Sequence, residues 1–212
     1  MGGDGTPRSP HLASTSSTLS TSSPRRLTRL PQFQLIVATL LFSWLAMQAV
    51  HESGHMLHAW TSGGTVTTVL LHPLEISRTD VAPNPRPQFV AWGGPVWGSL
   101  IPLAIYAVVR WRKLSRSWLV AFFAGFCLIA NGAYLLGGSL FPVGDAADLL
   151  RHGAPRAALF IFGMAGLASG LYLWNGLGKH FGLGSNATAI DRKAAWAMSG
   201  ATVLLVVLEL VR

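Results

Sequence analysis

Residues 35–60, LIVATLLFSWLAMQAVHESGHMLHAW, form the stretch that decides the fold. A helix needs about 20 predominantly apolar residues to cross the hydrocarbon core of a bilayer, and this run is long enough to do so. It also contains the motif HESGH at residues 51–55. Because ionisable side chains are costly next to lipid, the stretch predicts a membrane helix whose histidines and glutamate have a specific role.

The rest of the chain has the same membrane-like character. Of its 212 residues, 50% are hydrophobic and only 11% are charged, whereas soluble domains carry about 25% charged residues. Five apolar segments approach or exceed the length needed to span a membrane. They cover residues 33–60, 89–109, 118–140, 157–174 and 194–211. The sequence therefore predicts an all-α polytopic membrane protein with about five transmembrane helices.

Two regions fall outside these segments. Residues 63–81, GGTVTTVLLHPLEISRTDV, combine β-branched residues with Gly and Pro, which predicts a short β-hairpin-like segment at the membrane surface. Residues 1–30 are rich in Ser and Thr, so we expect a disordered tail there. The composition of this tail also fits an organelle transit peptide. The membrane domain is expected to cover residues 31–212.

The positions of the basic residues predict the orientation. If the five segments alternate in direction, eleven of the 16 Lys and Arg residues fall on the side of the N-terminus. The positive-inside tendency places that side in the cytoplasm. Because the basic residues lie in short runs between apolar segments, the net charge of +8 indicates a lipid bilayer as partner and no nucleic acid. The single cysteine, Cys127, excludes an internal disulfide and a zinc site built from cysteines.

The HESGH motif has the spacing of a metal site. His51 and His55 are four residues apart, so they share one face of a helix and can bind one cation through imidazole nitrogens. Glu52 follows the first histidine and is near enough to act as a general base on water at that cation. The other interpretation is two partly buried histidines and a surface glutamate. A glutamate in an apolar helix argues against it, since such a carboxylate is costly unless it is paired or functional.

A third ligand must come from elsewhere, because catalytic zinc usually has three protein ligands and one open position. His58 lies on the same helical stripe, but three ligands on one straight helix converge poorly on one ion. The stretch 131–150, NGAYLLGGSLFPVGDAADLL, offers Asp145 and Asp148 near the start of a new short helix, on one face of it. Both aspartates can equally cap that helix. The residues alone therefore leave three candidates for the third ligand.

These motifs together resemble the site-2 protease family of intramembrane zinc metalloproteases. The HExxH motif, the hairpin-like segment after it and the Gly-Pro helix AWGGPVWGSL at 91–100 are similar to the start of that family's core. Asn131, Pro142 and Asp145 resemble its second motif, an Asn and prolines that lead to Leu-Asp-Gly. Here Asp145 is flanked by Gly144 and Ala146 instead.

The resemblance implies a membrane metalloprotease-like domain that holds one Zn²⁺ ion per chain on His51, His55 and Asp145. It implies Glu52 as the catalytic residue and Asn131 as a residue that positions the substrate. The expected activity is endopeptidase cleavage of peptide bonds within or next to the membrane, with a membrane protein or peptide as substrate. Two alternatives stay open: a non-enzymatic membrane protein that binds or transports metal, and a metallohydrolase with a lipid-soluble, non-peptide substrate.

Overall fold

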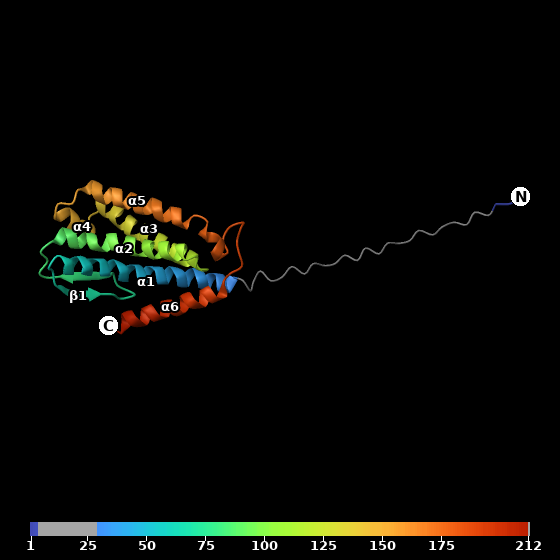
Figure 1. Ribbon diagram of the computed structural model, residues 1–212, viewed down its shortest axis with the longest axis horizontal. Coiled ribbons are helices and arrows are strands. Elements are labelled where there is room, and N and C mark those ends of the chain that lie inside the picture. The colour runs from blue at the N-terminus through green and yellow to red at the C-terminus, as the bar shows by residue number, and fades with distance from the viewer. Residues whose placement is uncertain (4–28, 212) are drawn as a thin grey trace.

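The computed structural model describes residues 1–3 and 29–211 and is a bundle of helices beside one small sheet (Figure 1). The elements are α1 (Arg29–Thr61), β1 (Val66–Leu70), β2 (Arg78–Val81), α2 (Pro87–Trp111), α3 (Ser117–Leu140), α4 (Gly144–Arg151), α5 (Arg156–Trp174), the 3₁₀ helix η1 (Leu177–Phe181) and α6 (Arg192–Leu210). The expected tail and transit peptide lie almost wholly outside the described residues. Helix α1 begins two residues before the predicted start of the membrane domain.

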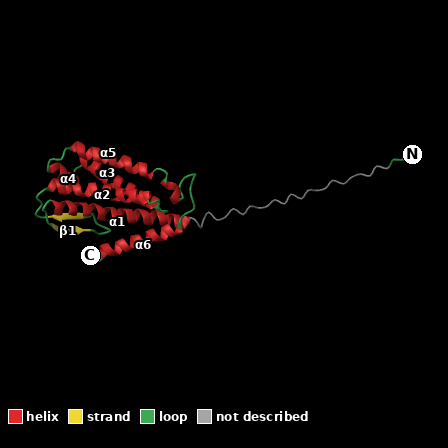
Figure 2. Ribbon diagram, in the orientation of Figure 1, coloured by secondary structure: helices red, strands yellow, loops and turns green. Residues whose placement is uncertain are grey.

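The predicted fold class is confirmed. Five helices of the described chain, α1, α2, α3, α5 and α6, are long and apolar enough to cross a membrane. Helix α4 has only 8 residues, so it is too short to span a bilayer. The two strands after α1 pair antiparallel as a hairpin (Figure 2). The chain is thus an all-α multi-pass membrane protein with a short β-hairpin after the first helix.

Glycines allow α1 and α2 to approach so closely that their backbones touch. A Cβ atom on Gly54 would lie 2.1 Å from the carbonyl oxygen of Gly93, and one on Gly93 would lie 2.3 Å from that of Gly54. Small residues at such a crossing let membrane helices pack without a hydrophobic driving force. The contact lies within the HESGH motif, so α2 passes directly beside the histidines.

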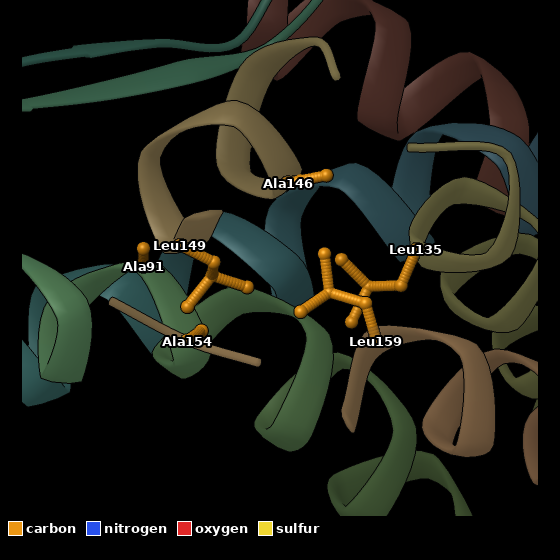
Figure 3. Close-up of a cluster of buried hydrophobic side chains, with 6 residues drawn as sticks. All are labelled: Ala91, Leu135, Ala146, Leu149, Ala154 and Leu159. Atoms are coloured by element: carbon orange, nitrogen blue, oxygen red, sulfur yellow. The ribbon is translucent and has the colours of Figure 1, made fainter. Parts of the chain in front are cut away.

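A compact apolar cluster fixes the short helix α4 against the bundle. Its buried members come from α2, α3, α4, the loop after α4, and α5 (Figure 3): Ala91, Leu135, Ala146, Leu149, Ala154 and Leu159. Ala146 and Leu149 of α4 are fully buried in it. Burying side chains of this kind stabilises a fold by about 25 cal/mol per Å². The cluster therefore holds α4 in one position, with its first turn directed toward α1.

The β-hairpin folds back along α1. The backbone N–H of Ser77 donates to Oε1 of Gln48 at 3.2 Å, and Gln48 lies about 20 Å along the helix from its last residue, Thr61, at 1.5 Å per residue. Helix α6 packs along the first half of α1, where the Thr202 hydroxyl in the middle of α6 donates to the carbonyl of Ala38. It ends near the hairpin (Figure 1).

Candidate metal centre

Three possible ligand atoms converge at the end of α1 and the start of α4. Nε2 of His51 lies 2.9 Å from Oδ2 of Asp145, and Nε2 of His55 lies 3.2 Å from the same oxygen. The two Nε2 atoms are 3.1 Å apart. The histidines are buried and Asp145 is half-buried. This triangle of two imidazole nitrogens and one carboxylate oxygen is a donor set that suits zinc.

The fold places each of these side chains. The histidines are one helical turn apart on α1, so both rings extend from one face. Asp145 is the second residue of α4, and its backbone N–H donates to the Tyr134 hydroxyl at 2.9 Å. Burial alone would raise the pKa of Asp145, but hydrogen bonds from His51 and His55 outweigh burial and hold this pKa well below its usual range. The carboxylate is therefore in the charged form that a metal ligand needs.

The remaining ring nitrogens of the histidines are held by the protein. Nδ1 of His51 donates to Oδ1 of Asn131 at 2.7 Å, and Nδ1 of His55 donates to the carbonyl of Val90 at 2.8 Å. With Nδ1 protonated, Nε2 is the nitrogen of each ring that faces the shared point, and its lone pair would bind a metal ion once the ion displaces the proton that is bonded to Asp145. Such outer partners fix the tautomer and orientation of metal-binding histidines. The donor set and its supporting hydrogen bonds thus fit a zinc ion.

The space around the rings depends on a residue of α2. A Cβ atom on Gly94 would lie 2.3 Å from Nε2 of His55 and 2.4 Å from Nε2 of His51. Any side chain there would displace the two nitrogens. Gly94 belongs to the Gly-Gly-Pro stretch of α2, but the sequence does not indicate that this glycine faces the histidines.

The other two candidates for the third ligand lie apart from the triangle. His58 uses both ring nitrogens elsewhere: Nδ1 donates to the carbonyl of Phe89 at 2.6 Å, and Nε2 accepts from Nε1 of Trp97 at 3.0 Å. Asp148 pairs with Arg151 on its own helix, and its side chain is half exposed. The structure brings neither to the histidines.

Asn131 is also held in place. Its Oδ1 accepts from His51, and its Nδ2 donates to the carbonyl of Cys127 at 2.9 Å. The side chain is buried at 2% exposure. These contacts make it a support of His51. Asn131 also lines the cavity that contains Glu52, and the substrate-positioning role that the resemblance implies stays a prediction.

Glu52 adjoins the triangle inside a cavity of about 1050 Å³. The cavity is lined by residues of α1, both strands, α2, α3 and α4. Glu52 itself is 3% exposed, and its Oε2 accepts a hydrogen bond of 2.7 Å from the hydroxyl of Thr79 in β2. The sequence gives no sign of this contact, because it depends on how the hairpin folds back.

The fold and this cluster define a class: a multi-pass helical membrane protein with a His-His-Asp group that could hold a metal ion. The chain matches no protein-family model, and neither the curated proteins nor the solved structures contain a significant match. The resemblance to site-2 proteases therefore depends on the motif residues alone and stays a prediction.

Proposed function

We propose that the protein is a zinc-dependent intramembrane endopeptidase that cleaves peptide bonds embedded in the membrane or close to it. The observation that supports this most strongly is the convergence of His51, His55 and Asp145 beside Glu52 in one cavity. Two imidazoles and one carboxylate are a ligand set found in catalytic zinc sites, and they would leave room for a water molecule on the ion. A buried carboxylate next to the ligands is the group that hydrolysis requires in addition to metal binding.

In this proposal the chain holds zinc through Nε2 of His51, Nε2 of His55 and Oδ2 of Asp145. The ion would supply Lewis-acid activation of water and of the scissile carbonyl. Glu52 accepts the proton of the attacking water and passes it to the leaving amine. Its Oε2 is already bonded to Thr79, so Oε1 is the oxygen that accepts the proton.

The substrate we propose is a membrane protein or a hydrophobic peptide. A membrane helix must unwind locally before it is cut, because its carbonyls are otherwise bonded within the helix. Residues 64–77 of the hairpin could hold the unwound strand by pairing along an open edge. Unchanged cleavage after deletion of residues 66–70 would contradict this edge pairing.

The orientation belongs to the same proposal. Helices α1 and α3 end beside the metal centre, and the basic loop RWRKLSR at 110–116 joins α2 to α3 at the opposite end of the bundle (Figure 1). The positive-inside tendency then puts the N-terminus in the cytoplasm and the metal centre near the outer face. Protease protection of tags on each loop would test this arrangement.

Glu52→Gln tests the activity. Wild type and variant are purified in detergent and assayed on a panel of quenched-fluorescent, Leu-rich peptides with one membrane-spanning helix and a Gly-Pro kink. We expect one zinc per chain in both proteins and a loss of cleavage of about 1000-fold or more in the variant, since it lacks the base and retains the ligands.

The control is Glu75→Gln, which changes an exposed glutamate of the hairpin loop and should leave cleavage unchanged. Equal cleavage by wild type and Glu52→Gln would exclude the protease. Zinc binding by wild type without cleavage of any peptide would favour a protein that stores or transports metal.

A further inference from the structure

The hydrogen bond between Thr79 and Glu52 joins the hairpin to the carboxylate beside the metal centre. The Thr79 hydroxyl donates to Oε2 at 2.7 Å, and Thr79 itself is half-buried. A buried carboxylate without hydrogen-bond donors is costly. Thr79 supplies such a donor from outside the helix that carries Glu52.

A second hydrogen bond fixes the register of this contact. Ser77 donates its backbone N–H to Gln48, and Thr79 donates its hydroxyl to Glu52. Ser77 directly precedes β2 and Thr79 lies in it; residues two apart in a strand are separated by about 6.6 Å, and residues four apart in a helix by about 6 Å. The two spacings match, so one hairpin position satisfies both bonds.

We propose that Thr79 is a positioning residue for Glu52: its hydroxyl holds Oε2, keeps the carboxylate in one rotamer and leaves Oε1 free to move the proton. This inference rests on the proposed peptidase function and adds a residue of the hairpin to it. The hairpin is then part of the catalytic arrangement as well as a wall of the cavity. A hydrolysis rate depends on such alignment, since small displacements of a catalytic group lower it strongly.

Two variants of Thr79 separate alignment from packing. Thr79→Val keeps the shape of the side chain and removes the donor, whereas Thr79→Ser keeps the donor and removes a methyl group. The matched control is Thr68→Val, an identical change at an exposed residue of β1 that does not line the cavity. All variants are assayed with a peptide that the wild type cleaves, together with Glu52→Gln.

For Thr79→Val we expect kcat to fall about 10- to 100-fold, the effect of losing a hydrogen bond to a charged group. KM should change by less than about threefold, and zinc should stay at one per chain, because neither the ligands nor their supports are altered. Thr79→Ser should recover kcat to within about threefold of wild type, and Thr68→Val should match wild type.

A second measurement uses the zinc-free protein and no activity. Arg78 precedes Thr79 and has an exposed side chain, so trypsin cleavage after Arg78 reports release of the hairpin from α1. We expect cleavage at this site, identified by mass spectrometry, to be several times faster in Thr79→Val than in wild type or Thr79→Ser.

Several results would overturn the inference while leaving the peptidase in place. These are a kcat for Thr79→Val within twofold of wild type, an equal loss in Thr79→Ser, a change confined to KM, loss of zinc, or an unchanged rate of tryptic cleavage. Full activity of Glu52→Gln would instead remove the peptidase, and the role of Thr79 with it.

Discussion

Two aspartates at the starts of helices show how similar positions serve different purposes. Asp145 opens α4 at one end of the bundle, and Asp191 precedes α6 at the other end (Figure 1). Each contacts basic side chains from a distant part of the chain: Asp145 contacts His51 and His55 of α1, and Asp191 contacts Arg116, the residue directly before α3. In sequence, both fit a helix cap.

The two aspartates differ in whether their side chains bond the free backbone N–H groups at the start of their own helix. Asp191 caps its own helix, because its Oδ1 accepts from the backbone N–H of Ala194 at 3.0 Å. At α4 the N-cap residue is Val143, and no side chain caps that helix. The carboxylate of Asp145 is thus directed away from its helix and toward the histidines. The geometry favours a structural role for Asp191 and a ligand role for Asp145.

The largest effect is expected for Asp145→Ala. Loss of a direct ligand should weaken zinc binding by more than the roughly 10- to 100-fold that loss of an outer-shell partner costs. Zinc content after dialysis of the purified protein measures this. Asp148→Ala is the control and should keep one zinc per chain. The opposite pattern would make Asp148 the ligand.

The next largest effect is expected for Gly94→Ala. This variant tests whether the histidines need the space beside Gly94 in order to face Asp145. The added Cβ must displace both Nε2 atoms, so zinc binding should weaken, and overpacking should lower the free energy of unfolding by about 1–3 kcal/mol. Zinc titration and thermal unfolding in detergent measure the two effects.

The matched control is Gly137→Ala in α3, where an added Cβ meets no atom within 4 Å. It should bind zinc as wild type does. Equal zinc affinity in both glycine variants would show that the histidines do not need the space at Gly94.

The smallest effect is expected for Asp191→Ala. Loss of the cap should cost about 1 kcal/mol of stability and leave zinc content unchanged. The hydrogen bond from Arg116 lowers the pKa of Asp191, so this carboxylate stabilises the fold above the pKa of the unfolded chain, about 4. That contribution is lost as the pH falls through about 4 toward the lower folded value.

Thermal unfolding of wild type and Asp191→Ala from pH 7 to pH 3 measures this contribution. The two stabilities should converge at the acid end. A difference in stability that stays constant across this pH range would contradict the ion pair. Loss of zinc from Asp191→Ala would show that Asp191, like Asp145, is needed for metal binding.

The sequence predicts the helices well, because hydropathy is a local property. The five spans were expected within a few residues of their observed bounds, and the hairpin after α1 was expected from its β-branched residues. The spacing of His51 and His55 likewise predicts a shared face, since it depends only on the helical repeat.

Contacts between elements are harder to predict from the sequence. The i, i+3 spacing of Asp145 and Asp148 did not say which carboxylate reaches α1, because that depends on how the cluster around Ala146 and Leu149 rotates α4. His58 shares a stripe with the ligands, yet Phe89 and Trp97 occupy its nitrogens. Such pairings depend on how packed helices rotate and cross, and a single sequence does not allow this rotation and crossing to be predicted.

The depth of the hairpin has a consequence for water. Helix α1 has 33 residues and is about 50 Å long, so it exceeds the roughly 30 Å thickness of the hydrocarbon layer. If the excess length of about 20 Å is divided between the two ends of the helix, the contact between Ser77 and Gln48 lies below the headgroups.

A two-stranded sheet leaves an outer edge on each strand, and lipid cannot satisfy such edges. At that depth water would have to reach the hairpin edges, in a hydrated notch that runs from the nearer surface toward the cavity. The second reactant of a hydrolysis would arrive through that notch, without a dedicated channel.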